Sequence, residues 1–494
     1  MFNNLKLILI FSSILVYNCG GNESKSRLPL STKSIEASDL YHEAMYLNNI
    51  FMGDKAKTKL EEAVNLDPNF GAAFLMLSTF GSNSVSETDN YYEKALSLKD
   101  KMNDVEKCFL DIRSSYRNDD IETRVQASKR LIDLIPENAI AHERMAYTQY
   151  EMANIEEVRK SALKAIDFDK YYSPAYTILV NSYTFTEPKS FDKAEKFAKQ
   201  VLAFNKDRSF YHVMLGDVYR AQNKLEEAAK KYDDAYNTGT NNWLSAAKAG
   251  HAYTMFNPEE ARKRFDQAVN EARTDNQKIG PEQAKVYTHL HQNNFQKALA
   301  QVELIKTSLP NYDFSDQEIQ SQMSGLLWHE YFIYSHSGQY ALAKNALKEK
   351  RRIDIALSKL SKNELSVYNT ESTLLWLDSH LEIMKGNYEV AKNKLSDLYN
   401  RVKTTSDPKR FDGYNNLMGM ANLMSGNAKK SIEHFEAVVE EENIYFQYFK
   451  GLSYKADGKL DAAKKTFKYV ATYNFNGLIY TMVRNKAIEE VAKG

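Results

Sequence analysis

Histidines and cysteines are the side chains here best suited to metal or nucleophilic chemistry, and the chain has ten histidines and two cysteines. His289 and His291 stand two residues apart, which on a helix turns their side chains about 200° away from each other. His329 precedes Glu330 but has no second histidine four residues later, as a zinc-protease helix requires. His329 and His336 would share a helix face, where we expect groove or surface histidines. We therefore expect no metal site.

Other motifs that carry chemistry are also missing. The sequence has no glycine-rich phosphate loop, no nucleophile elbow and no paired-cysteine metal motif. Its 65 basic residues balance 65 acidic ones, so it lacks the basic field that nucleic acid requires. We expect a non-enzymatic protein with no cofactor and no nucleic-acid partner.

One cysteine has a specific use. An apolar run, residues 7–17, follows Lys6 and is too short to span a bilayer, which is typical of a secretory signal. The following Val16-Tyr17-Asn18-Cys19 resembles a bacterial lipobox, although Tyr17 and Asn18 stand where that motif has small residues. The resemblance implies cleavage before Cys19 and a lipid on its thiol. The alternative is an ordinary cleaved signal with an incidental cysteine, and both export the protein.

These features divide the amino-terminal region into a signal peptide, residues 1–18, and a polar flexible tether, residues 19–33. The expected location is the bacterial cell envelope, as a membrane-anchored lipoprotein that faces the periplasm or the cell surface. Cys108 is expected to be a small buried apolar residue.

The rest of the chain carries a repeat. Glycine and proline are scarce, at 19 and 9 residues, which argues against loop-rich folds. Pro68 and Pro136, each at the end of an apolar periodic stretch, are 68 residues apart, or two units of 34. The clearest unit begins at Ser209 and carries small or aromatic residues at fixed positions: Leu215, Gly216, Tyr219, Ala228, Tyr232 and Ala235.

This pattern resembles the tetratricopeptide repeat, a pair of antiparallel helices, A and B, in each 34 residues. A small residue at position 8, such as Gly216, lets helix A approach helix B closely. Glycines near position 15 are expected to form the turn between the helices, where positive φ is cheap. These glycines are Gly338, Gly386, Gly426 and Gly458.

The resemblance implies an all-α fold, a right-handed α-solenoid of about twelve helix-turn-helix units with a terminal capping helix, residues 476–494. The units are expected to start near residues 37, 71, 105, 139, 173, 209, 243, 279, 324, 372, 412 and 444. The polar segment Arg273–Pro281 is the expected bend between an amino-terminal array, 34–275, and a carboxy-terminal array, 276–475. Residues 317–337 are expected to form one unbroken helix.

In this family, positions 2, 5, 9 and 12 of helix A line the concave face. The resemblance gives the first array a polar lining, which comprises Arg113, Tyr147, Asn181, Asp217, Arg220 and His251. The later units receive an apolar lining, which comprises Trp328, Phe332, Trp376, His380, Met420 and Tyr448. Two tryptophans at position 5 suggest interface anchors. The alternative is that longer helices cover their own inner face, or that this register is wrong by one residue.

The leading functional hypothesis is an envelope-anchored scaffold that binds a protein or peptide partner in its concave groove. The first alternative is a glycan or small-ligand capture lipoprotein at the outer membrane, which would need long loops that this chain has little room for. The second is an enzyme with a dispersed site. The carboxylate clamp of chaperone-binding members is not expected, because Thr177 stands where that clamp needs lysine.

Overall fold

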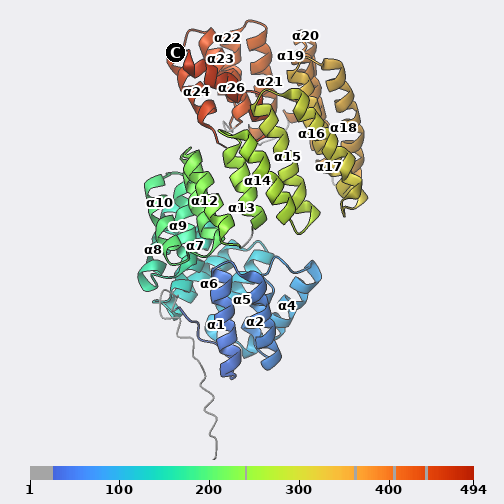
Figure 1. Cartoon of the computed structure of the whole chain (residues 1–494). Helices are drawn as coiled ribbons and strands as arrows, with labels where there is room; N and C mark the ends of the chain where they lie inside the picture. The colour runs from blue at the N-terminus through green and yellow to red at the C-terminus, as the bar shows by residue number, and fades with distance from the viewer. Residues whose placement is uncertain are drawn as a thin grey trace, which may run out of the picture. The chain divides into compact units, whose positions relative to one another are not determined.

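The computed structural model describes residues 26–239, 242–360, 364–403, 408–439, 443–474 and 476–493. Within these ranges the chain is all-α and contains no strand. It forms two compact units, of which unit 1 ends at Asn205 and unit 2 begins at Lys206 (Figure 1). The predicted signal peptide, residues 1–18, and Cys19 lie outside the described residues.

Unit 1 is a series of antiparallel helical pairs. In chain order its helices are α1 (Ile35–Asn49), α2 (Gly53–Leu66), α3 (Gly71–Leu77), α4 (Val85–Ser97), α5 (Asp104–Arg117), α6 (Ile121–Leu134), α7 (Ala139–Glu151), α8 (Ile155–Phe168), α9 (Ser173–Phe185) and α10 (Phe191–Ala203). A short 3-10 helix, Lys99–Lys101, precedes α5. The two helices of each pair pack together, and first helices of successive pairs also touch, as in α3 with α5 and α7 with α9.

Unit 2 continues the same arrangement. Its helices are α11 (Ser209–Ala221), α12 (Leu225–Asn237), α13 (Asn242–Tyr253), α14 (Pro258–Glu271), α15 (Asp275–His291), α16 (Phe295–Ser308), α17 (Asp316–His336), α18 (Tyr340–Leu360), α19 (Glu364–Met384), α20 (Tyr388–Val402), α21 (Asp412–Met424), α22 (Ala428–Glu436), α23 (Ile444–Ala456), α24 (Leu460–Thr472), α25 (Leu478–Thr481) and α26 (Arg484–Ala492). Two 3-10 helices, Leu309–Asn311 and Pro408–Phe411, lie in connections.

The repeat units predicted from spacing are present. Helix A begins within about one turn of the predicted position in every pair but two. Those two exceptions are α17 and α19, which have 21 residues each and begin about two turns early. Helix α17 confirms the single helix expected over 317–337. The expected capping helix is divided into α25 and α26.

The expected boundary near residue 275 falls between α14 and α15, inside unit 2. Thr274 caps α15 by accepting a hydrogen bond from the Gln277 amide, and the helix then passes through Pro281 without ending. Lys285 on α15 pairs with Asp266 on α14 at 2.8 Å. Most of the polar segment thus forms the first turns of a packed helix, and the compact units divide after Asn205 instead.

Turns between paired helices follow the predicted chemistry. The four glycines expected at position 15 all have positive φ, between 76° and 85°. In five of the other described pairs the same place is taken by non-glycine residues with positive φ, which are Phe51, Asp119, Ala153, Asn223 and Asn293. Asparagine and aspartate tolerate this left-handed conformation better than other side chains, so at three of these five residues the backbone strain is small.

The small residue at position 8 packs against an aromatic ring of helix B. A Cβ built on Gly250 would lie 2.6 Å from Cε1 of Phe265, and one on Gly451 would lie 2.7 Å from Cε1 of Phe467. Gly419 has the same relationship with Phe435, at 2.8 Å. Contacts this short exclude any side chain, so glycine lets the ring fill the space between the paired helices.

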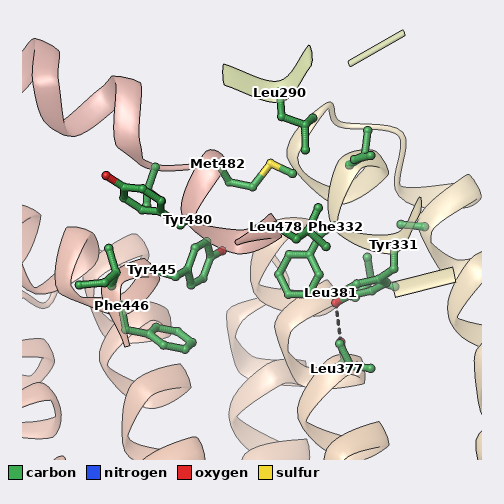
Figure 2. Packing of buried hydrophobic residues seen from close by; sticks show 14 of the residues in the cluster. Leu290, Tyr331, Phe332, Leu377, Leu381, Tyr445, Phe446, Leu478, Tyr480 and Met482 are labelled. Atoms are coloured by element: carbon green, nitrogen blue, oxygen red, sulfur yellow. Dashed lines mark hydrogen bonds between the residues drawn. The ribbon is translucent and has the colours of Figure 1, made fainter. Parts of the chain in front are cut away.

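The core of unit 2 extends through its later pairs. Tyr331 and Phe332 on α17 lie opposite Tyr445 on α23, and the Tyr331 hydroxyl donates to the carbonyl oxygen of Leu377 on α19 at 2.8 Å (Figure 2). Leu478 on α25 packs into the same cluster. Helix α25 contacts α15, α17 and α23, so the end of the chain closes over the inner face of these helices.

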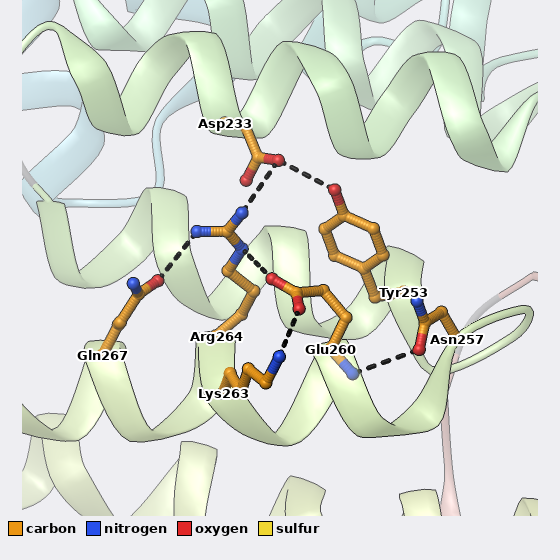
Figure 3. A network of polar contacts seen from close by, with 7 residues as sticks. All are labelled: Asp233, Tyr253, Asn257, Glu260, Lys263, Arg264 and Gln267. Carbon is orange, nitrogen blue, oxygen red and sulfur yellow. Dashed lines mark hydrogen bonds and ion pairs between the residues drawn. The ribbon is translucent and has the colours of Figure 1, made fainter.

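A polar network joins three helices of unit 2 (Figure 3). Arg264 on α14 contacts the Asp233 carboxylate of α12 at 3.2 Å and the Glu260 carboxylate at 3.3 Å. The Tyr253 hydroxyl of α13 donates to the same Asp233 carboxylate at 2.8 Å. Burial raises the pKa of Asp233, while the Tyr253 hydrogen bond and the Arg264 charge oppose that rise.

Candidate functional site

The apolar lining expected in the later units is mostly core. Phe332, His380 and Met420 have no exposed surface, and Tyr448 is also buried. The prediction of an open groove at these four residues is therefore wrong, because they belong to a closed core. Helices α17 and α19 have 21 residues each and begin about two turns before the predicted unit starts, which fits the alternative that longer helices cover their own inner face. Helix α25, which the sequence did not place on this face, also contacts α17 and α23.

The two predicted anchors are packed against one another. The rings of Trp328 and Trp376 stack with centroids 6.4 Å apart, and Trp376 stacks on His380 at 5.5 Å. Both indoles are half-buried at the border of the core. Because their faces are already used by neighbouring rings, they offer a partner little free aromatic surface.

Two of the polar residues predicted to line the inner face of unit 2 are bound by two asparagines from later in the chain, Asn474 and Asn476. Arg220 Nε donates to the carbonyl oxygen of Asn474 at 2.9 Å. The Asn476 side chain contacts His251 Nδ1 at 3.3 Å and His291 Nε2 at 3.0 Å. Asn474 and Asn476, between α24 and α25, thus lie against α11, α13 and α15.

The third polar residue predicted in unit 2, Asp217, is paired inside its own repeats. It accepts hydrogen bonds from Lys248 and from the Tyr232 hydroxyl, both at 2.7 Å. These contacts join α11 to α12 and α13. Asp217, like Arg220 and His251, has internal partners in this structure.

Unit 1 contains an open cavity of about 480 Å³ along its inner face. Residues of α1, α3, α5, α7 and α9 line it, so it follows the first helix of each pair. Arg113 and Tyr147, both predicted from the repeat register, are in this lining. The exposed Asn181 lies with Tyr147 at a smaller neighbouring hollow. The register thus brings these three predicted residues to one face of unit 1.

The cavity is apolar and aromatic, with a few polar groups. Its apolar and aromatic lining includes Leu28, Leu30, Tyr41, Met45, Met76, Phe109, Tyr116, Tyr147 and Tyr172. This composition and size are typical of sites that bind a small molecule or a few side chains of a peptide. Burial raises the pKa of Tyr147 to about 12, so its hydroxyl is a neutral donor and acceptor at pH 7.

Two arginines supply the cationic groups of the cavity. Arg113 donates through Nη2 to the carbonyl oxygen of Ser78 at 2.8 Å, and Arg144 pairs with Glu143 at 2.9 Å. The Nε atoms of both arginines are buried and have no hydrogen-bond partner. Glu143 also accepts from the Tyr172 hydroxyl at 3.1 Å. The two guanidinium groups thus bring positive charge to the wall of the cavity.

Sequence reasoning missed one wall of this cavity. Residues 26–33, expected at the end of a flexible tether, instead lie along unit 1, where Leu28 is 6% exposed. Leu28 and Leu30 line the cavity. The signal that could have found them is the pair of leucines around Pro29 in an otherwise polar stretch.

Among the described residues, no group of three or more His, Cys, Asp or Glu side chains is placed to hold a metal ion. None of the described helices combines the length and the apolar character needed to cross a membrane. Cys108 is buried and unpaired by disulfide, as expected of a small core residue.

Comparison with known proteins adds no specific relative. No family model matches the chain, and no curated protein matches it. Similar solved structures include YrrB, a TPR protein with an unusual peptide-binding site. The two chains are 19% identical, the alignment covers 36% of this chain and 90% of YrrB, and the TM-score is 0.30. The APC/C hetero-tetramer Cut9–Hcn1 aligns at 14% identity, 92% and 76% coverage, and TM-score 0.37. A tetratricopeptide repeat protein from Parabacteroides merdae aligns at 15% identity, 64% and 98% coverage, and TM-score 0.34.

These likenesses are too distant to carry an argument about function. The class of the fold rests on the chain itself, through its paired helices, its glycine turns and its glycine–aromatic contacts. The protein is an all-α solenoid of tetratricopeptide-type helical pairs.

Proposed function

We propose that this protein is a non-catalytic scaffold that binds a peptide or a peptide segment of a protein in the inner groove of unit 1. The observation that carries this proposal is the cavity of about 480 Å³ beside Arg113, Arg144 and Tyr147. An apolar side chain of the partner would fill the cavity, and the guanidinium groups of Arg113 and Arg144 in its lining would attract a carbonyl or carboxylate oxygen.

We further propose that the scaffold works in the cell envelope, anchored through a lipid on Cys19. Support comes from the signal-like run and the lipobox-like residues before Cys19. Replacing Cys19 by Ala should release the protein from the membrane fraction or block its processing. Equal membrane retention of the Cys19→Ala variant would leave a plain signal peptide.

The binding proposal can be tested with an array of short synthetic peptides of varied sequence. Peptides that the full chain retains should bind the Arg113→Ala and Tyr147→Ala variants at least about tenfold more weakly, because both side chains line the cavity. Arg130→Ala is the matched control, since Arg130 is on α6, outside the cavity lining, with half of its side chain exposed. Peptide binding that is the same in all three variants would contradict a groove in unit 1.

A further inference from the structure

The chain already places one extended segment in this groove. Residues 26–32 carry no helix, and the side chains of residues 26–30 alternate in exposure. Leu28 is buried and Leu30 is half-buried, and both face the cavity, while Arg27 and Pro29 are exposed. This alternation is that of an extended strand with one face on a surface.

A ladder of polar side chains holds the segment by its backbone. Asn138 Nδ2 donates to the carbonyl oxygen of Arg27 at 2.8 Å, and Asn103 Nδ2 donates to that of Pro29 at 3.0 Å. Carboxylates hold its two ends. Asp169 accepts from the Ser26 amide at 3.0 Å, Glu106 accepts from the Ser31 amide at 3.0 Å, and Asp67 accepts from the Thr32 hydroxyl at 2.6 Å.

The ladder repeats with the helical pairs. Asp67, Asn103, Asn138 and Asp169 each stand within a few residues before a first helix, namely α3, α5, α7 and α9. The segment crosses them in reverse order, since residue 32 meets Asp67 and residue 26 meets Asp169. Side chains at equivalent places of successive repeats therefore form a row of contacts across the groove, as solenoid geometry requires.

Most of the hydrogen bonds in this ladder are made to main-chain groups of the segment and not to its side chains. Asn103, Asn138 and Glu106 bind carbonyl and amide groups that every extended peptide presents, while the side chains at positions 28 and 30 meet the apolar cavity. The groove is thus built for a strand with apolar side chains two residues apart. We propose that unit 1 recognises extended peptides of this kind, and that residues 26–32 are its resident intramolecular occupant.

This inference rests on the proposed function and specifies how the partner is bound. The segment leaves a cavity of about 480 Å³ beside its two leucines, with Arg113 and Arg144 in the lining. A partner strand that used the same ladder and also filled this space would gain contacts that the resident segment does not make. The resident segment, in turn, competes as a tethered ligand with an effective concentration on the order of millimolar.

The test supplies the segment in trans. The probe is a fluorescein-labelled peptide with the sequence of residues 26–33, and binding to the full chain is followed by anisotropy. The Leu28→Asp, Leu30→Asp double variant expels the resident segment, because each change would place a carboxylate in the apolar cavity near Glu106 and Glu143. We expect the probe to bind this variant at least tenfold more tightly than the unaltered chain.

The ladder is tested by adding Asn103→Asp and Asn138→Asp to that variant. Both asparagines also cap helices through Oδ1, which accepts from the Glu106 and Ile140 amides, and aspartate keeps that acceptor while it removes the Nδ2 donor. Probe binding should fall at least tenfold with helicity unchanged. A probe in which both leucines are replaced by aspartate should bind none of these proteins.

Hydrogen exchange gives a second readout in the full chain, at the Leu28 amide, which donates to His42 Nε2 at 3.1 Å, and at the Ser31 amide, which donates to Glu106. These amides should exchange slowly in the unaltered chain and faster with Asn103→Asp and Asn138→Asp alone. Failure of the probe to bind the Leu28→Asp, Leu30→Asp variant would overturn the inference. Array peptides that still depended on Arg113 and Tyr147 would then leave the proposed function intact.

Discussion

Gly216 on α11 lies so close to the ring of Tyr232 on α12 that a Cβ at residue 216 would be 2.6 Å from Cε1 of that ring. Tyr232 is fully buried, and its hydroxyl donates to Asp217 at 2.7 Å, so the ring is held at both ends. The glycine at position 8 and the aromatic residue at position 24 of the repeat are therefore one packing device.

We expect Gly216→Leu to lower the free energy of unfolding by about 1–3 kcal/mol, because the side chain must push the two helices apart. Repeats contact mainly their neighbours, so the loss should appear first in α11 and α12. Hydrogen exchange should speed up over residues 209–237 while residues 35–66 stay protected. Unchanged exchange in α11 and α12 would contradict this packing.

Such devices explain why the repeats could be predicted from the sequence. Gly216 and Tyr232 are 16 residues apart, and a glycine with an aromatic residue returns at the same spacing as Gly419 with Phe435 and as Gly451 with Phe467. A contact that is local and periodic leaves a periodic trace in the sequence. The starts of the helical pairs follow from it, except where α17 and α19 are extended by about two turns.

The segments that lie on the inner faces, residues 26–32 in unit 1 and Asn474 with Asn476 in unit 2, leave no periodic pattern in the sequence. Ser26 meets Asp169 across 143 residues, and Arg220 meets Asn474 across 254 residues. Each contact occurs once, so no periodicity marks it, and the residues concerned stand in stretches without helical pattern. Arg113 and Tyr147, which the register assigned to the inner face, line the cavity of unit 1, but only the structure shows where that cavity lies.

The network around Arg264 should contribute to the stability of unit 2. Arg264→Met removes the cation that contacts Asp233 and Glu260 and leaves the partly buried Asp233 carboxylate with only the Tyr253 hydroxyl from this network. We expect the free energy of unfolding to fall by about 1–3 kcal/mol in urea titrations. Lys263→Met is the matched control, because Lys263 is 73% exposed and should change stability by less than about 0.5 kcal/mol.

Buried histidines predict a loss of stability in acid. Burial lowers the pKa of His380 to about 3, against an ordinary value of 6.5 in the unfolded chain. The unfolded state therefore binds the extra proton between these two values. Stability is fully present above pH 6.5 and falls toward pH 3, by about 1.4 kcal/mol per pH unit for this residue well below its unfolded pKa.

His380→Gln should reduce that slope, because glutamine does not titrate and can still hydrogen-bond to Tyr331 or Tyr445. The measurement is the free energy of unfolding at several pH values from 4 to 7.5. A slope equal to that of the unaltered chain would show that His380 titrates normally in the folded protein.

Trp376 and Tyr147 should respond in opposite ways to the same truncation. Trp376 packs on Trp328 and His380 at the edge of a core, so Trp376→Ala should lower the free energy of unfolding by about 3 kcal/mol and leave peptide binding per folded molecule unchanged. Tyr147 is 40% exposed at the cavity of unit 1, so Tyr147→Ala should cost about 1 kcal/mol or less in stability. It should also weaken binding of an array-selected peptide roughly thirtyfold, as loss of an aromatic anchor does. Urea titration and anisotropy on both variants separate the two effects. If Trp376→Ala instead abolished binding at full stability, the partner groove would lie in unit 2.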